Sequence, residues 1–260
     1  MVALKVTVCE LPDDRAAFSR EWERLSKHVG RESSDVVLLP EMPFFEWFCA
    51  GPQYEAPVWE EAVAEHRRWT ERLPELGAKV VLGSMPVNRG GKRLNQGFVW
   101  TRSGGTKGVH EKRYLPDEPG FFEGTWYDRG DGKFEPFDVA GWRGGYMICS
   151  ELWSMANART YGKRGVGLVA VPRATGVRSL EKWVAGGRVA AVLAGAYCAS
   201  SNRAGARGQA SFGGRGWVID PDGEVLGMTT KARPFVTVEL DRARAEKAKK
   251  TFPRDALEPD

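Results

Sequence analysis

The chain has 260 residues, of which 28% are charged, and its 38 basic and 34 acidic side chains leave a net charge of +4 at neutral pH. Such a small excess, with basic residues scattered among acidic ones, does not indicate nucleic-acid binding. No apolar run approaches the roughly 20 residues that span a membrane, so we expect a soluble protein with no membrane partner. The length is near the upper size for one hydrophobic core, which predicts a single domain over residues 1–260.

Strand and helix patterns alternate along the first third of the chain. Residues 4–9 alternate as a strand, and an amphipathic helix follows with Phe18, Trp22 and Leu25 on one face. The order then repeats as a buried strand, a helix and a second buried strand, over residues 35–39, 59–76 and 79–84.

The order of elements changes in the rest of the chain. Two hairpins, a helix, a strand, a helix and three strands are predicted in turn, over residues 96–113, 134–148, 152–161, 167–171, 180–193, 196–200, 215–220 and 235–240. A turn at 221–224 separates the last two strands, and Asp241 caps a final helix. This order fits mixed sheets with helices outside. Sites are expected in the long connections, which are residues 44–57, 117–131 and 204–216.

The cysteines and the N-terminus bear on the cellular setting. Cys9, Cys49, Cys149 and Cys198 include no Cys-x-x-Cys pair and make no disulfide framework in a chain of this length. Residues 1–9 lack the basic and long apolar regions of a secretory signal. Both observations favour a reducing, cytoplasmic setting, with Cys9, Cys49 and Cys198 as packing thiols.

Cys149 stands where the apolar strand pattern of residues 144–148 gives way to a helix pattern. A thiol at such a turn faces unpaired amide donors and the positive end of the helix dipole, which favours the thiolate and stabilises an oxyanion. The alternative is a buried core cysteine, the commonest role of a lone cysteine in an apolar run. The choice between the two depends on whether Cys149 has catalytic partners.

A histidine base for Cys149 is poorly supported, because the chain has only His28, His66 and His110. His28 and His66 fall on helix patterns that are predicted to face solvent. His110 shares a strand face with Lys112, two residues further on, so it is possible but unnecessary. A carboxylate in a dry pocket is the alternative base, since desolvation raises its affinity for protons.

Two charged side chains at strand ends are candidates for this chemistry. Glu41 ends the apolar run of residues 36–40, where it is either a catalytic carboxylate or a solvated glutamate. Lys112 is either a solvated charge or a cation that stabilises an oxyanion, and a neighbouring carboxylate would keep it protonated when buried.

Together these segments resemble the nitrilase superfamily of carbon-nitrogen hydrolases, whose hallmark is a Glu-Lys-Cys triad in this chain order. The matching motifs are Leu-Pro-Glu ending at Glu41, His-Glu-Lys ending at Lys112 and Ile-Cys-Ser-Glu around Cys149. Residues 116–123 resemble the loop of N-carbamoylputrescine amidase-like members, and they place Glu123 where the family carries a second active-site glutamate. The resemblance extends over nearly the whole chain.

The resemblance implies a four-layer α-β-β-α sandwich of two mixed sheets, no metal or organic cofactor, and association into homodimers or larger homo-oligomers. It implies that Cys149 attacks an amide or nitrile carbon, that Glu41 passes the thiol proton to the leaving amine, and that Lys112 stabilises the oxyanion. The backbone amide of Ser150 would be a second oxyanion donor, and Glu123 would orient the substrate or the lysine. Loss of ammonia or amine leaves a thioester, which water hydrolyses to a carboxylic acid.

Two motifs bear differently on the substrate. Glu151 stands two residues past the nucleophile, where many amidases of the family have aspartate and many nitrilases have glutamate. The loop before Glu123 instead resembles that of amidases. We therefore expect a small amide or N-carbamoyl substrate, with nitrile hydrolysis as the alternative.

Further residues are candidates for binding the substrate. Arg173 either binds a substrate carboxylate or forms a structural salt bridge. Aromatic residues near the motifs, among them Phe45, Trp126 and Trp153, predict a dry, partly apolar pocket, although core packing explains about half of such residues.

Two hypotheses of other classes stay open. The first is a binding or scaffolding protein that has lost turnover, which the intact Glu41, Lys112, Glu123 and Cys149 disfavour. The second is a histidine-dependent thiol hydrolase, which would rely on His110.

Overall fold

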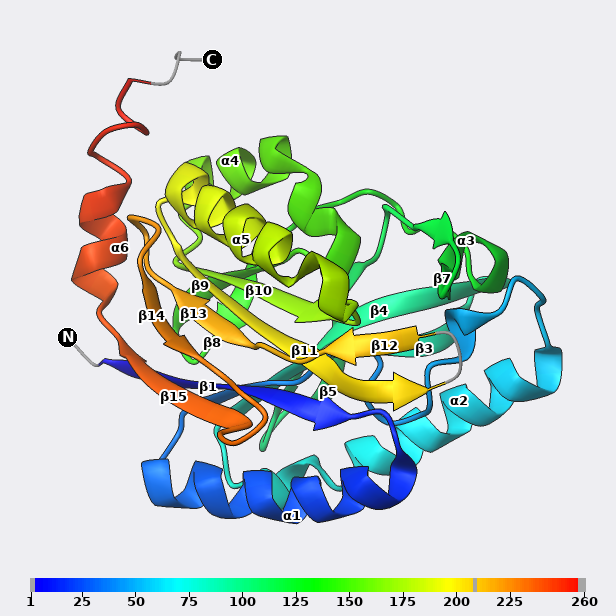
Figure 1. The fold of residues 1–260 in the computed structure, drawn as a ribbon. Coiled ribbons are helices and arrows are strands. Elements are labelled where there is room, and N and C mark those ends of the chain that lie inside the picture. The colour runs from blue at the N-terminus through cyan, green and yellow to red at the C-terminus, as the bar shows by residue number, and fades with distance from the viewer. Residues whose placement is uncertain (1–2, 208–209, 257–260) are drawn as a thin grey trace.

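Strand β1 (Leu4–Pro12) joins the two halves of a large sheet (Figure 1). It pairs in parallel with β2 (Val36–Leu38) and, at its C-terminal end, with β11 (Tyr197–Arg207), and antiparallel with β15 (Phe235–Leu240). The computed structural model describes residues 3–207 and 210–256. Residues 1–2 and 257–260 of the predicted domain and 208–209 of the predicted 204–216 connection lie outside the described residues.

In the described part of the chain, thirteen strands form this sheet and two short strands form a separate hairpin. The main path runs β5-β4-β3-β2-β1-β11-β10-β9-β8, with β12 and β13 on β11, β14 on β13 and β15 on β1. The remaining bounds are β3 (Val80–Arg89), β4 (Lys92–Thr101), β5 (Gly105–Glu111), β6 (Asp117–Glu118), β7 (Phe121–Phe122), β8 (Phe137–Val139), β9 (Trp142–Tyr146), β10 (Leu168–Arg173), β12 (Ala210–Gly213), β13 (Trp217–Ile219) and β14 (Val225–Met228).

Helices cover both sides of the strands (Figure 1). Helices α1 (Arg15–Glu32) and α2 (Ala56–Thr70) lie on one side, and α4 (Met155–Lys163) and α5 (Leu180–Ala194) lie on the other. Asp14 begins α1, because its side chain accepts the backbone N–H of Ala17 at 2.7 Å. The short helix α3 (Glu123–Trp126) follows β7, and α6 (Arg242–Ala248) begins at its predicted cap, Asp241.

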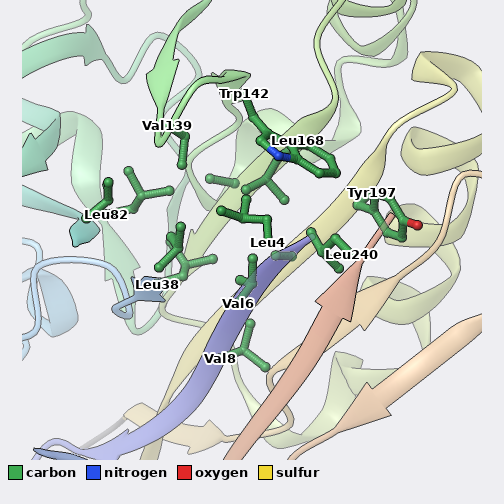
Figure 2. Packing of buried hydrophobic residues seen from close by; sticks show 14 of the residues in the cluster. Leu4, Val6, Val8, Leu38, Leu82, Val139, Trp142, Leu168, Tyr197 and Leu240 are labelled. Atoms are coloured by element: carbon green, nitrogen blue, oxygen red, sulfur yellow. The ribbon is translucent and has the colours of Figure 1, made fainter. Parts of the chain in front are cut away.

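The buried apolar residues form one core between strands and others beneath the helices. Figure 2 shows the first, in which Leu38 and Leu82 from the β2 and β3 part of the sheet pack near Leu168 from β10. A second cluster joins α1 to the outer side of β1 to β4, and a third joins α4 and α5 to β10, β11 and β13. The described residues therefore form a mixed α/β structure, which confirms the predicted class, and thirteen of their strands are hydrogen-bonded into one large sheet.

Several boundaries differ from the sequence prediction. The predicted helix over 59–76 is two elements, because α2 ends at Thr70 and a 3₁₀ helix, η2 (Leu73–Leu76), begins beside a proline that cannot donate a helical hydrogen bond. The predicted helix over 152–161 is likewise divided into η3 (Cys149–Trp153) and α4.

The last strands also pair differently from the prediction. The turn at 221–224 joins β13 to β14, which was not predicted, and β15 pairs with β1. The β6–β7 hairpin and β12, inside the predicted long connections, were not predicted either. These strands are only two to four residues long, too short for a periodic pattern to reveal.

Candidate active site

Cys149 follows β9 at the sharp turn that the sequence predicts. Its backbone φ is +49°, a left-handed conformation that is uncommon for a residue other than glycine. Glu151 fixes this turn, because its Oε2 accepts the N–H of Ile148 at 2.8 Å and its Oε1 accepts the N–H of Arg113 at 2.7 Å. The nucleophile turn is thereby attached to the segment that carries Lys112.

Lys112 lies between two carboxylates. Its Nζ donates to Glu41 Oε1 at 2.7 Å and to Glu123 Oε2 at 2.5 Å, and all three side chains have no exposed surface. Glu41 lies just beyond the end of β2, Lys112 just beyond β5, and Glu123 at the start of α3. Three segments that are distant in sequence thus meet beside Cys149, whose titration is influenced by all three charges.

Neighbouring polar groups hold the two carboxylates. Asn95 Nδ2 donates to Glu41 Oε1 at 2.8 Å, and the hydroxyl of Tyr127 donates to Glu123 Oε2. Arg203, paired with the buried carboxylate of Asp13, donates to the backbone carbonyl of Glu41 at 3.1 Å. These contacts fix the position of both carboxylates before any ligand binds.

Burial and the neighbouring charges set the protonation of the lysine cluster. Burial alone lowers the pKa of Lys112, but the charges of Glu123 and Glu41 outweigh it, so the pKa lies above its ordinary value and Lys112 is an ammonium. Burial raises the pKa of Glu123 to about 7 against the opposing charge of Lys112, and Glu41 adds to the rise. Glu123 therefore titrates near neutral pH.

The expected stabilisation of the Cys149 thiolate is wrong for this structure. Burial raises the pKa of the Cys149 thiol well above its ordinary value, and Glu41 adds to the rise while Lys112 opposes it. The helix that follows is one short 3₁₀ segment, so its dipole does not outweigh desolvation. The thiol is therefore protonated at neutral pH, and it could act as a nucleophile only with a base to remove its proton.

Several buried acceptor atoms lack a donor among the described residues. They are Glu41 Oε2, Glu123 Oε1 and Asn95 Oδ1. Buried carboxylate oxygens are rarely left without a partner, because an unmade hydrogen bond costs about 1 to 3 kcal/mol or more for a charged group. The cluster is therefore suited to a ligand that brings N–H or O–H donors.

A cavity of about 350 Å³ opens onto this cluster. Cys149 and Glu123 line it together with Ser150, Trp153, Ala174, Thr175, Gly176, Ser179, Trp183 and, from the segment around the β6–β7 hairpin, Pro116, Asp117, Glu118 and Phe121. This lining includes three carboxylates and no lysine or arginine. A larger groove of about 670 Å³, between α1 and β15, contains none of the four predicted catalytic residues.

The five predicted substrate-binding residues divide into two groups. Ser150 and Trp153 line the cavity, and Trp153 is 48% exposed at its edge. Phe45, Trp126 and Arg173 are not part of that lining. Trp126 is buried and donates from Nε1 to the carbonyl of Gly51 at 2.9 Å, and Phe45 lies in the same aromatic cluster. For these two aromatic side chains, core packing is the better description.

Arg173 lies behind the cavity wall, fully buried. Among the described residues it pairs with no carboxylate, so the salt bridge that the sequence allowed is absent there. It donates instead to the Oγ of Ser200, the Oγ1 of Thr175 and the carbonyl of Arg215, each at 2.7 Å.

Among the described residues, no histidine hydrogen-bonds to the Cys149 thiol, whose acceptor is the carbonyl of Ala174. His110 Nε2 contacts Glu151 Oε2 at 2.7 Å, and Nδ1 lies 3.2 Å from the carbonyl oxygen of Lys133. Both partners accept hydrogen bonds, so His110 donates from both nitrogens and is a cation. His66 is fully buried and accepts the backbone N–H of Phe44, so its predicted solvent-facing position is wrong. His28 is only half-buried.

Tyr127 and Thr175 are among the residues of the site that were not predicted from the sequence. Tyr127 lies four residues after Glu123, the spacing of one helical turn, which is a usable signal once α3 is known. Thr175 has no such signal, because its place in the wall depends on how β10 and β11 pair.

A membrane-spanning helix or a metal site would be recognisable in the described residues. None of their helices is both long and apolar enough to cross a bilayer. They also contain no group of three or more His, Cys, Asp or Glu side chains placed to bind a metal ion.

The chain belongs to the carbon-nitrogen hydrolase family, whose sequence pattern matches residues 5–250. It is therefore a hydrolase that acts on carbon–nitrogen bonds. It is 26% identical to a nitrilase from Pyrococcus abyssi over 84% of this chain and 81% of that protein. It is also 23% identical to an N-carbamoylputrescine amidase from Solanum tuberosum, over 90% and 85%. A carbon-nitrogen hydrolase from Helicobacter pylori G27 has the same fold, with a TM-score of 0.87 and 22% identity over 98% of this chain and 95% of that one.

Proposed function

We propose that this protein hydrolyses the C–N bond of a small amide or N-carbamoyl compound through a thioester on Cys149. The observation that carries the proposal is the buried Lys112 ammonium, which contacts both Glu41 and Glu123 beside the thiol. Such an arrangement supplies a base, an oxyanion partner and a nucleophile in one dry site.

In this mechanism Glu41 takes the proton from the Cys149 thiol while sulfur attacks the carbonyl carbon. Lys112 Nζ and the backbone N–H of Ser150 stabilise the oxyanion, and Glu41 passes the proton to the leaving nitrogen. Ammonia or amine departs and leaves the thioester. Glu41 then deprotonates a water molecule that attacks this thioester, and the acid departs as the sulfur regains its proton.

The unpaired acceptors favour amides over nitriles. Glu41 Oε2 and Glu123 Oε1 are buried without donors among the described residues, and an amide or ureido nitrogen carries N–H groups that would pair with them. A nitrile nitrogen carries none. Nitrile hydrolysis stays the second candidate, because one relative is named a nitrilase.

We also propose that residues 1–260 form one domain in which the two halves of the large sheet, joined at β1, face each other as in a four-layer sandwich. The three apolar clusters support this arrangement, since one lies between strands and the other two lie beneath helices on opposite sides. Homo-oligomerisation and a cytoplasmic location stay predictions.

The test measures ammonia release from amides, N-carbamoyl compounds and matching nitriles, with wild type beside Cys149→Ala. Cys198→Ala is the matched control, because Cys198 is an equally buried thiol on β11, outside the cavity. We expect ammonia from amides or carbamoyl compounds that Cys149→Ala alone abolishes, and an acyl adduct on Cys149 in acid-quenched samples by intact-protein mass spectrometry. Turnover of nitriles alone would establish the second candidate. Absence of any ammonia and any adduct would point to the non-catalytic alternative.

A further inference from the structure

Arg173 is a buried cation with neutral partners. It has no exposed surface, and its three hydrogen-bond acceptors are two hydroxyls and a backbone carbonyl. The guanidinium carbon lies 3.9 Å from the ring centre of Trp217, a cation–π contact. A buried charge without a counter-ion is costly, and burial lowers the pKa of Arg173 to about 9. Retention of such a charge beside a cavity indicates a role for it.

Thr175 links this cation to the cavity. This residue lines the cavity and is 3% exposed, and its hydroxyl oxygen accepts from Arg173 Nη1 at 2.7 Å. Asn202 fixes its backbone from both sides, since Oδ1 accepts the Thr175 N–H at 2.9 Å and Nδ2 donates to the Thr175 carbonyl at 3.2 Å. The Thr175 hydroxyl is therefore held in one position by groups behind the wall.

The hydroxyl proton of Thr175 has no acceptor among the described residues. Because Arg173 donates to the oxygen, the hydroxyl's own role is that of a donor. The charged guanidinium of Arg173 also polarises the Thr175 hydroxyl. This polarisation strengthens any hydrogen bond that the hydroxyl donates. The wall thus presents a fixed, strengthened O–H donor to whatever enters the cavity.

We propose that Thr175 is a specificity-determining residue that donates its hydroxyl proton to an oxygen in the acyl chain of the substrate, and that Arg173 is the positioning residue behind it. This inference rests on the proposed function and names a feature of the substrate. The reacting carbonyl already has partners in Lys112 and the Ser150 amide, which leaves the Thr175 hydroxyl for a second oxygen.

The charges around the cavity indicate what kind of oxygen this is. Asp117 and Glu118 line the cavity, are exposed, and no lysine or arginine lines it beside them. A substrate carboxylate would be repelled there, whereas a hydroxyl, ether or second carbonyl oxygen would not. The expected substrate class is therefore a neutral-chain amide or carbamoyl compound that carries such an oxygen.

The experiment compares pentanamide with its isosteres, in which an ether or hydroxyl oxygen replaces one carbon of the acyl chain. We expect wild type to favour at least one isostere by about 10- to 100-fold in kcat/KM. Thr175→Val should remove this preference, and Thr175→Ser should keep it. Arg173→Gln should weaken it, and the double variant Arg173→Gln/Thr175→Val should lose no more than Thr175→Val alone, because Arg173 acts through Thr175.

Binding of the same compounds to Cys149→Ala by calorimetry separates this inference from the proposed function. If wild type turns over none of them but the inactive variant still binds the oxygen-containing isosteres more tightly, the proposed hydrolysis fails for these amides and the inferred recognition of a second oxygen stands. Equal affinities and equal turnover of pentanamide and all isosteres would overturn the inference. So would a Thr175→Val variant that keeps the wild-type preference, or additive losses from Arg173→Gln and Thr175→Val.

Discussion

Two buried ion pairs begin only two residues apart in the chain, and they differ in how completely they are satisfied. In the pair of His110 and Glu151, both carboxylate oxygens accept hydrogen bonds from the protein. In the cluster around Lys112, one oxygen of Glu41 and one of Glu123 have no donor among the described residues. The first arrangement is complete as a structural connection. The second arrangement has acceptors left for a ligand. Satisfaction of hydrogen bonds therefore distinguishes a supporting pair, His110 with Glu151, from the proposed reactive cluster around Lys112, although both are buried.

The largest effect is expected at the reactive cluster, from Lys112→Met. The methionine has a similar length but no charge, so it removes the oxyanion partner and leaves two buried carboxylates that repel each other. We expect kcat/KM for the best amide to fall about 10³-fold. The measurement is steady-state ammonia release. Lys133→Met is the control, because Lys133 is exposed and pairs with Asp131 on the surface. Activity within a few-fold of wild type would show that Lys112 is not the oxyanion partner.

The second prediction concerns the supporting pair, through Glu151→Ala. This change leaves the His110 cation buried without its partner and frees the backbone N–H groups of Ile148 and Arg113. Breaking a buried pair in this way costs about 3 to 5 kcal/mol in the free energy of unfolding. Urea denaturation measures it, with Glu181→Ala on the surface as the control, expected to change stability by less than about 1 kcal/mol. Unchanged stability with lost turnover would mean that Glu151 acts in catalysis and that the comparison is wrong.

These two regions also show what the sequence can reveal. The local pattern made Cys149 and Glu41 candidates, because each follows an apolar strand, but a core cysteine and a solvated glutamate stayed open as alternatives. Lys112 was a candidate at a strand end with a solvated charge as its alternative, and Glu123 was inferred only from the family motif. The sequence does not show that their side chains meet. Their convergence with Glu41 arises from sheet order, which places the ends of β2 and β5 on one side.

The surroundings of Arg173 and His66 could not be predicted from the sequence, because they depend on tertiary packing. Arg173 reads from sequence as a candidate for binding carboxylates, but the parallel register that pairs it with Asn202 on β11 directs its contacts to Ser200 and Thr175. His66 reads as a solvent-facing helix residue, but the segment after Glu41 packs against α2, and the backbone N–H of Phe44 donates to His66. In both cases the deciding neighbour lies more than 20 residues away in sequence or on another strand, where periodicity carries no information.

The smallest effect is expected from His110→Gln, which tests the supporting pair through the pH dependence of the free energy of unfolding. Burial alone lowers the pKa of His110, but Glu151 outweighs it, with smaller contributions from the Lys133 carbonyl and Asp131, so the pKa is raised above 6.5. A raised pKa in the folded state means that the contribution to stability is complete below about pH 6.5, the unfolded value, and is lost as pH rises through the folded value.

Urea denaturation of wild type and His110→Gln at a series of pH values isolates the contribution of His110 to the free energy of unfolding. Other groups, including Glu123, titrate in both proteins, so the difference in unfolding free energy between them reports His110 alone. We expect wild type to be the more stable protein below pH 6.5 and its advantage to shrink as pH rises above that value. An advantage that stays constant with pH would show that folding leaves the pKa of His110 unchanged, which overturns the prediction. An advantage that instead grows as pH rises through 6.5 would show that His110 is neutral in the folded protein, because only the unfolded chain would then lose a proton. The supporting pair would then be a neutral hydrogen bond, and charge would no longer be what it shares with the cluster around Lys112.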